Sequence, residues 1–306
     1  MGKIAFVFSG QGAQYSGMGK SLYEMGGRIK ELYDVAEKFR PGTMEQSFNG
    51  TDEELKNTAN TQPCLYLVEL AAAIALNENG IKADGVAGFS LGEIAALAYA
   101  GAYSHDAGFE IVTKRGLCMS QAADKADTSM VAVMKLDANK VIELTSKFEQ
   151  LYAVNFNCPG QIVVSGLSSS MDNFCDAVKE AGGKTVPLAV SAAFHSPFMS
   201  EASKEFATKL KDYNISLPTI PVYANLNAQP YDSDVASMLE SQMKSPVRWQ
   251  ETIENMIADG YTDFIEVGAG KTLCGLIKKT SKEVKTYSVQ DNNTLLEVIK
   301  AVKENA

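Results

Sequence analysis

The chain has 306 residues, of which 45% are hydrophobic and 21% are charged, and its formal net charge is −9. This length is enough to bury one large core with a second, smaller module beside it. The acidic balance argues against nucleic acid as a main partner, because phosphate binding needs a basic surface. The five cysteines are widely spaced and form no CxxC pair, so we predict neither a disulfide framework nor a metal site.

The apolar segments are too short for a membrane protein. The N-terminal run Ile4–Phe8 is shorter than the apolar region of a signal peptide. The stretch Leu65–Leu76 is interrupted by Glu69 and falls short of the roughly 20 residues of a transmembrane helix. We therefore expect a cytoplasmic protein that makes no use of a membrane.

The first 126 residues alternate between apolar runs and helical stretches. The predicted strands cover residues 4–8 and 85–89, and the predicted helices cover residues 20–39, 63–79, 91–100 and 105–123. Alternation of strand and helix is typical of an α/β fold with a mostly parallel sheet.

The pattern changes after Asp127. Strands are predicted over residues 130–134, 151–155, 161–166 and 184–189, with helices over 139–148 and 171–181. This β-α-β-β-α-β order is the ferredoxin-like arrangement. We predict that residues 127–190 form a ferredoxin-like subdomain inserted into a catalytic core made of residues 1–126 and 191–306. The second part of that core resumes the alternation, with strands at 221–225 and 263–267 and helices at 200–210, 249–258, 272–281 and 294–304.

A short motif at the turn between the predicted strand 85–89 and the helix 91–100 suggests a nucleophile. Gly88-Phe89-Ser90-Leu91-Gly92 matches G-x-S-x-G, with an apolar strand before it and a helix after it. Such a turn exposes the serine hydroxyl at a helix N-terminus, where unpaired N–H groups favour developing negative charge. The structural alternative is a βα loop in which Ser90 only caps the helix.

A serine needs a base to act as a nucleophile at neutral pH, and the chain offers two histidines, His105 and His195. His105 lies in a polar segment at a predicted helix start. His195 lies between small and aromatic residues and just before Pro197, which suits a buried site. The alternative for His195 is a hydrogen-bonded histidine of the core.

One charged residue interrupts an apolar helix face. In the predicted helix 105–123, Ile111, Arg115 and Met119 are spaced four residues apart and share one face. A buried charge is costly unless it is paired, and arginine matches a carboxylate in bidentate fashion. Arg115 is therefore a candidate clamp for a substrate carboxylate. An internal salt bridge or a surface arginine with a buried stem is the alternative.

Lys278, Lys279 and Lys282 form a basic cluster in an otherwise acidic chain. Such a cluster is a candidate contact for an acidic protein partner. The alternative is an ordinary solvated helix face.

Taken together, these segments resemble the malonyl-CoA:acyl carrier protein transacylases, and more broadly the acyltransferase domains of polyketide synthases. The resemblance covers nearly the whole chain. It rests on ordered matches that begin with FVFSGQGAQ and GFSLGE and continue with KRGLCM, VNFNCPGQIVVSG, AFHSP, SPVRW and EVGAGK.

The resemblance implies an α/β-hydrolase-like core with a ferredoxin-like insert, as the pattern of elements also predicts. It implies that Ser90 is acylated, that His195 is its general base, and that the backbone N–H groups of Gln11 and Leu91 form the oxyanion hole.

The resemblance further implies that Arg115 binds the malonyl carboxylate, with Met119 beside it. A backbone carbonyl holds the histidine in this family, and the matching position here is Gln242, so no aspartate is required. The residue before the serine is usually His in the family, and here it is Phe89. Acyl selectivity or rate is expected to differ for that reason.

The implied reaction moves a malonyl group from malonyl-CoA to the phosphopantetheine thiol of acyl carrier protein, for fatty acid or polyketide synthesis. The coenzyme A thioester is a substrate, and no tightly bound cofactor is implied. We expect a monomer, with Lys278 and Lys279 as the candidate docking residues for the carrier protein.

Two other functions remain compatible with the motifs. A serine hydrolase, such as an esterase or thioesterase, would use the same strand-to-helix turn. A module that binds a carrier protein without catalysis is also conceivable, but the presence of Ser90, His195 and Arg115 together argues against it.

Overall fold

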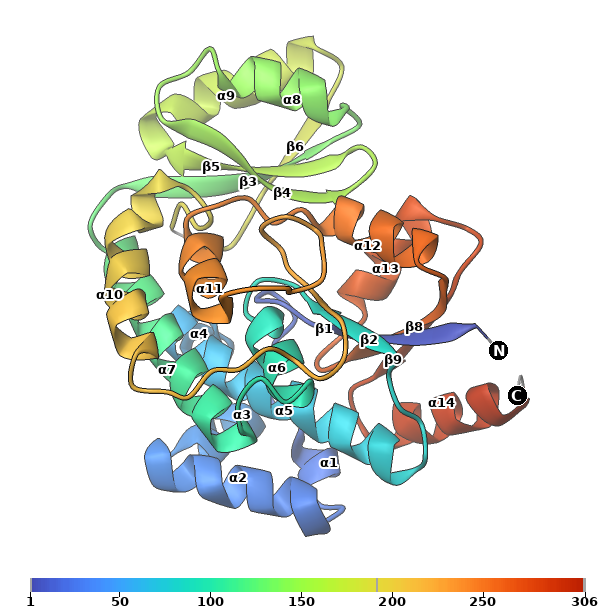
Figure 1. The fold of residues 1–306 in the computed structure, drawn as a ribbon. Coiled ribbons are helices and arrows are strands. Elements are labelled where there is room, and N and C mark those ends of the chain that lie inside the picture. The colour runs from blue at the N-terminus through green and yellow to red at the C-terminus, as the bar shows by residue number, and fades with distance from the viewer. Residues whose placement is uncertain (1, 191, 305–306) are drawn as a thin grey trace.

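The computed structural model describes residues 2–190 and 192–304, and it contains two sheets (Figure 1). The larger sheet has five parallel strands in the order β7-β2-β1-β8-β9. These strands are β1 (Lys3–Phe8), β2 (Gly85–Gly88), β7 (Val222–Tyr223), β8 (Tyr261–Val267) and β9 (Lys285–Val289). Residues 5–8 of the central strand β1 are buried on both faces, which explains its unbroken apolar run.

Helices pack around this sheet, and the longest of them, α5 (Thr58–Glu78), is buried from Thr61 to Leu76. We predicted that this helix begins at Pro63, and that prediction is wrong by five residues. The side chain of Asn57 accepts a hydrogen bond from the Ala59 N–H at 3.0 Å and so caps an earlier start.

The expected helix over residues 20–39 is two helices, α1 (Lys20–Tyr23) and α2 (Gly27–Phe39). Gly26, which precedes α2, and Gly27, its first residue, have φ values of 77° and 55°, which a continuous right-handed helix does not allow. The other predicted helices of the larger body are α6 (Gly92–Tyr99), α7 (His105–Ala123), α10 (Ser200–Leu210), α12 (Trp249–Ala258), α13 (Thr272–Thr280) and α14 (Asn292–Glu304).

Five elements escaped the sequence analysis. They are α3 (Thr43–Asn49), α4 (Asp52–Lys56), α11 (Val235–Met243), the 3₁₀ turn Pro197–Met199 and the strand β9. The helices α3 and α4 are too short to show a clear apolar period. The edge strand β9 alternates little, because Lys285 is exposed and the next three residues are half-buried.

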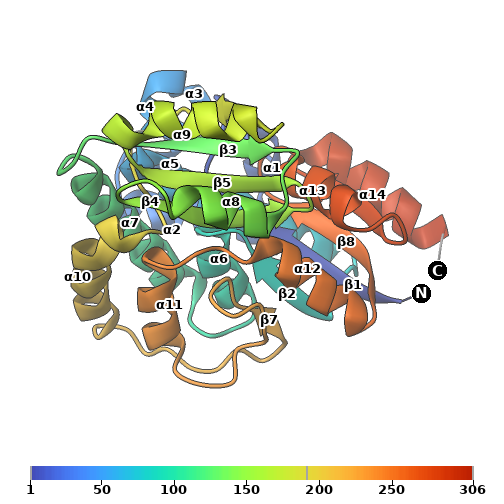
Figure 2. The same ribbon diagram turned by 90° about the horizontal axis from the view of Figure 1, so that it is seen from above.

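The smaller sheet is antiparallel, with the strand order β4-β5-β3-β6. It consists of β3 (Thr128–Met134), β4 (Leu151–Cys158), β5 (Gln161–Leu167) and β6 (Lys184–Pro187), and the helices α8 (Ala138–Thr145) and α9 (Ser168–Glu180) cover its outer face (Figures 1 and 2). The predicted fold class, a mostly parallel α/β sheet with a ferredoxin-like part, is confirmed. The boundaries at residues 127 and 190 stay predictions.

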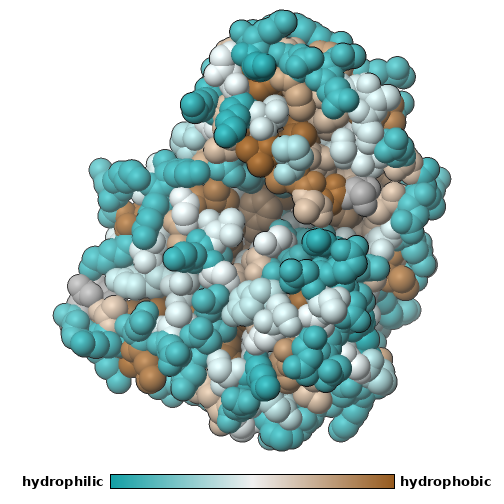
Figure 3. Space-filling model, turned by 180° about the vertical axis from the view of Figure 1, so that it is seen from behind, coloured by the Kyte–Doolittle hydropathy of each residue, from teal (hydrophilic) through white to brown (hydrophobic). Residues whose placement is uncertain are grey.

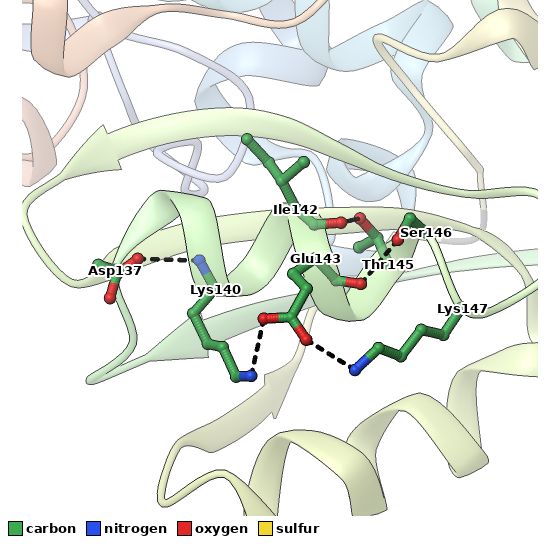
Figure 4. Close-up of polar contacts among 7 residues, drawn as sticks. All are labelled: Asp137, Lys140, Ile142, Glu143, Thr145, Ser146 and Lys147. Atoms are coloured by element: carbon green, nitrogen blue, oxygen red, sulfur yellow. Dashed lines mark hydrogen bonds and ion pairs between the residues drawn. The ribbon is translucent and has the colours of Figure 1, made fainter.

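The helix α8 shows how the outer layer of the smaller sheet meets solvent (Figure 4). Asp137 caps its first turn by accepting from the Lys140 N–H at 2.8 Å. Glu143 pairs with Lys140 at 2.8 Å and with Lys147 at 2.7 Å. These ion pairs lie on the exposed face, where each contributes little to stability. Val141 and Leu144 turn the other way and are buried.

The carboxyl ends of β1 and β2 face the smaller sheet, and a cavity of about 640 Å³ lies between them. Figure 3 shows a hollow at this level, with apolar residues gathered around it. The chain ends lie far from this edge, beside each other (Figures 1 and 2). No helix in residues 2–190 or 192–304 is both long and apolar enough to cross a membrane.

The close approach of α6 to β1 generates a prediction about Gly92. A Cβ atom at Gly92 would lie 2.4 Å from the backbone oxygens of both Phe8 and Ser9. Because backbone atoms cannot move aside cheaply, Gly92→Ala should lower the free energy of unfolding by about 1–3 kcal/mol, the usual range for overpacked sites. Urea denaturation monitored by circular dichroism measures this.

Gly275 in α13 is the matched control, because a Cβ there meets nothing within 4 Å. Gly275→Ala should raise the free energy of unfolding by about 0.5–1 kcal/mol through helix propensity. Equal effects of the two substitutions would contradict the packing argument.

Candidate active site

Ser90 lies on a strained turn between β2 and α6. Its φ is 55°, a left-handed conformation that costs a non-glycine residue about 1–3 kcal/mol. Asn225 holds the turn from both sides, because its Oδ1 accepts from the Ser90 N–H at 2.7 Å and its Nδ2 donates to the Gly88 carbonyl at 2.6 Å. The turn presents the Ser90 side chain to the cavity.

His195 lies against the Ser90 hydroxyl, with 2.7 Å between Ser90 Oγ and His195 Nε2. The other ring nitrogen, Nδ1, is 3.0 Å from the backbone carbonyl of Gln242. A carbonyl oxygen can only accept, so Nδ1 carries the hydrogen and Nε2 of the neutral ring accepts from Ser90. This arrangement can take a proton from the hydroxyl.

The surroundings of His195 keep the ring neutral. Burial, and then the charge of Arg115, lower the pKa of His195 from 6.5 to about 4. At neutral pH the ring is therefore unprotonated and available as a base. His105, the other histidine, lies at the start of α7 and lines no part of this cavity.

Arg115 is fully buried on α7. Its Nη1 donates to Gln62 Oε1 at 3.0 Å, and its Nη2 donates to Gln242 Oε1 at 2.8 Å and to Ser90 Oγ at 3.1 Å. No salt bridge to it is found among the described residues. Arg115 therefore fits neither alternative considered for it, an internal salt bridge or a surface arginine with a buried stem.

The guanidinium keeps unused donors. Arginine has five N–H groups, three hydrogen bonds engage Nη1 and Nη2, and Nε has no partner in the described part of the chain. Burial lowers the pKa of Arg115 to about 10, and the charge of Glu93 opposes that shift. The group is thus a cation at neutral pH, and its unused donors are the Nε–H and one N–H of Nη1, whereas Nη2 beside Ser90 is fully engaged.

Gln11 and Leu91 both line the cavity with Ser90 and His195. Gln11 lies in the turn after β1, and Leu91 precedes the first residue of α6. The N–H of a residue at that position has no acceptor inside the helix. The Leu91 N–H is therefore a suitable donor to a developing oxyanion, and the role of the Gln11 N–H stays a prediction.

Met119 lies one helical turn after Arg115, is buried, and lines the cavity. Its sulfur lies 3.4 Å from Nε2 of Gln62, the residue that also binds Arg115.

Phe89 packs its ring against Trp249, with the ring centroids 5.5 Å apart. It lies beside Gly10, where any Cβ would be 2.8 Å from the Phe89 ring.

Lys278 and Lys279 are exposed in the last turn of α13 and do not line the cavity. Lys279 Nζ donates to Gln161 Oε1 at 3.1 Å, across to the smaller sheet. The structure thus brings together Ser90, Arg115, His195 and Gln242, and it leaves the two lysines apart from them. A role of these lysines in docking stays a prediction.

Sequence reasoning missed Gln62, Asn225 and Glu93, which all contact the residues above. Glu93 carries a signal that could have been used, because it is a charge within the apolar helix Gly92–Tyr99. Gln62 and Asn225 carry none, since neutral amides occur at many buried and exposed positions.

Comparisons with known proteins agree over the whole chain. The family model described as acyl transferase domain matches residues 5–302. A malonyl CoA-acyl carrier protein transacylase of Bacillus subtilis is 39% identical over 99% of this chain and 98% of its own length.

Solved structures give the same result. The malonyl CoA-acyl carrier protein transacylase of Clostridium perfringens superposes with a TM-score of 0.95 at 34% identity, covering 99% of this chain and 98% of that one. A malonyl-transacylase solved in complex with a type II PKS acyl-carrier protein gives 0.93 at 30% identity, covering 98% and 99%. This chain therefore belongs to the acyl transferase domain family.

Proposed function

We propose that this protein transfers a malonyl group from malonyl-CoA to the phosphopantetheine thiol of an acyl carrier protein, through a malonyl ester of Ser90. One observation carries the proposal: Ser90 Oγ lies 2.7 Å from His195 Nε2 and 3.1 Å from Arg115 Nη2. A nucleophile is thus in contact with a base and with a buried cation. The names of the relatives support the same substrate and acceptor.

In the first half-reaction, Ser90 Oγ attacks the thioester carbonyl while its proton passes to His195 Nε2. The backbone N–H groups of Gln11 and Leu91 stabilise the oxyanion of the tetrahedral intermediate, an interaction worth about 3–4 kcal/mol for a donor in other enzymes. The carbon–sulfur bond then breaks, and the imidazolium of His195 protonates the departing thiolate of coenzyme A.

In the second half-reaction, His195 takes the proton of the carrier thiol, and the thiolate attacks the malonyl ester. The intermediate collapses with return of that proton to Ser90 Oγ. The backbone carbonyl of Gln242 stabilises the imidazolium by accepting from Nδ1, which makes a Ser-His dyad. All steps use groups of the chain and substrates, so no tightly bound cofactor is required.

Arg115 selects the acyl group. A single methylene separates the malonyl carboxylate from the ester carbonyl, so its receptor has to lie close to Ser90 Oγ. When Ser90 is acylated, its oxygen becomes an ester oxygen and a weaker acceptor, which releases Nη2 for the carboxylate. Met119 lies beside this position and gives the methylene an apolar contact.

Replacement of the proposed nucleophile tests the covalent step. Wild-type protein incubated with malonyl-CoA should gain one malonyl ester, and Ser90→Ala should gain none, because no other hydroxyl occupies its position. Intact-protein mass spectrometry measures the adduct. The ester should persist in water and disappear when carrier protein with its phosphopantetheine arm is added.

A malonyl adduct on the Ser90→Ala protein would refute the assignment of the nucleophile. An ester that is lost to water at the same rate with and without carrier protein would instead identify a serine hydrolase.

Removal of the guanidinium tests acyl selection. Arg115→Ala should reduce kcat/KM for malonyl transfer about 100-fold, since loss of a buried charge partner costs about 2–5 kcal/mol. Acetyl transfer by the same variant should change far less, because an acetyl group has no carboxylate. Steady-state kinetics with the two coenzyme A thioesters make the comparison, and an equal loss for both would reject the carboxylate clamp.

The pKa of His195 sets the pH dependence. Because its pKa is lowered to about 4, the ring stays neutral as the pH falls from 7 to 5, and kcat/KM for acylation should not follow an ordinary histidine titration. The unfolded chain binds a proton near pH 6.5 and the folded ring does not, so stability should decrease as the pH falls between these two values.

Pre-steady-state acylation measured over a range of pH gives the pH at which kcat/KM falls as His195 becomes protonated. Arg115→Met should move this fall toward higher pH, because the charge of Arg115 helps to lower the pKa of His195. An apparent pKa of 6.5 or above in the wild-type protein would contradict this description of the site.

A further inference from the structure

Arg115 shares its buried surroundings with Glu93, whose role is not explained by the mechanism. Glu93 lies in the first turn of α6 and is fully buried. Its Oε2 accepts from the Asn225 N–H at 2.9 Å and from Gln242 Nε2 at 3.1 Å. Its Oε1 accepts from the hydroxyl of Tyr231. The backbone N–H of Glu93 donates to the Ser90 carbonyl at 3.2 Å, but the hydrogen bonds of its carboxylate go to Asn225, Gln242 and Tyr231 and not to Ser90 or His195.

The side-chain amide of Gln242 connects the two buried charges. Its Nε2 donates to Glu93 and, at 2.8 Å, to the Ser90 carbonyl. Its Oε1 accepts from Arg115 Nη2 at 2.8 Å. A carboxylate only accepts and a guanidinium only donates, so the two charges together fix which way this amide points.

We propose that Glu93 is a positioning residue: it is the buried counter-charge of Arg115, and it acts through the amide of Gln242 to hold the guanidinium at Ser90 before substrate binds. The use of the guanidinium position to bind a malonyl carboxylate rests on the function proposed above. The pairing of Glu93 with Arg115 does not depend on that function.

The requirement for a counter-charge follows from burial. An isolated buried cation is strongly unfavourable, and the direct partners of Arg115 are the neutral groups of Gln62, Gln242 and Ser90. Glu93 is the carboxylate whose charge raises the pKa of Arg115 against the effect of burial. An amide bridge in place of direct contact leaves part of the guanidinium available to a second anion.

The other buried glutamates are engaged elsewhere. Glu69 accepts from the Ser9 hydroxyl at 2.9 Å. Glu266 accepts from the backbone N–H groups of Leu273 and Cys274 at 3.1 and 2.8 Å, at the start of α13. Neither of these glutamates has a hydrogen bond to Arg115 or Gln242. The pairing is therefore specific to Glu93.

Glu93→Gln removes the charge and can keep the hydrogen bonds. The amide oxygen of the variant can accept from Asn225 and Gln242, and its NH₂ group can donate to Tyr231, whose hydroxyl then accepts. The expected change is a lower urea midpoint of the substrate-free protein, because the guanidinium loses its counter-charge. Combined with Arg115→Met, the same substitution should cost much less, since no buried cation remains.

This double-mutant cycle needs no substrate, so it tests Glu93 even if the proposed reaction is wrong. Glu266→Gln, measured with and without Arg115→Met, is the matched control and should cost the same in both backgrounds. Equal costs of Glu93→Gln in the two backgrounds would overturn the inference. A Glu93→Gln protein that fails to fold alone but folds with Arg115→Met supports it, and failure in both backgrounds overturns it.

A second measurement links the pairing to the acyl group. In Glu93→Gln, the malonyl ester supplies the missing negative charge, so acylation should raise the melting temperature more than it does in the wild type. Acetylation of Ser90 should raise the melting temperature of the variant and of the wild type by the same amount. The double-mutant cycle can show coupling between Glu93 and Arg115 while malonyl and acetyl esters raise the melting temperature by equal amounts. In that case the counter-charge is supported, and the carboxylate clamp of the proposed function is rejected.

Discussion

A positive charge buried beside the hydroxyl of Ser90 is the constraint on which the rest of the site depends. Arg115 can occupy this position only because amide oxygens from α5 and α11 accept its hydrogen bonds. Gly116, the next residue, lets α7 approach α5 closely, since a Cβ there would lie 3.0 Å from the Thr58 carbonyl. A glycine inside a helix costs about 1 kcal/mol relative to alanine, and here it allows Arg115 to reach Gln62.

Gln242, which satisfies part of this charge, also helps Asn225 to hold the catalytic residues. Ser90 and His195 both have left-handed φ values, 55° and 58°. Asn225 fixes the backbone of Ser90 by accepting from its N–H, and the Gln242 carbonyl orients the ring of His195. The segment from β7 to α11 thus supplies no reacting atom, but it places both members of the dyad relative to each other.

Much of the architecture could be predicted from periodicity. The helices 105–123, 200–210 and 249–258 have the expected bounds, and the last two are clearly amphipathic. The helix α11 and the strand β9 were missed, since neither shows a long regular pattern. In the site, Ser90 and Arg115 stand out as residues at unusual positions in their elements. Gln62 and Asn225 do not, because their importance arises only from contacts between elements distant in sequence.

The adjacency of the two chain ends follows from the parallel sheet. β1 enters at the amino end of the central strands, and α14 returns to that end after β9, whereas the cavity lies at the carboxyl ends. A short peptide could therefore join the termini, and new ends could be opened in an exposed loop, without a change to the cleft. For the same reason the whole unit is suited to insertion within a longer polypeptide.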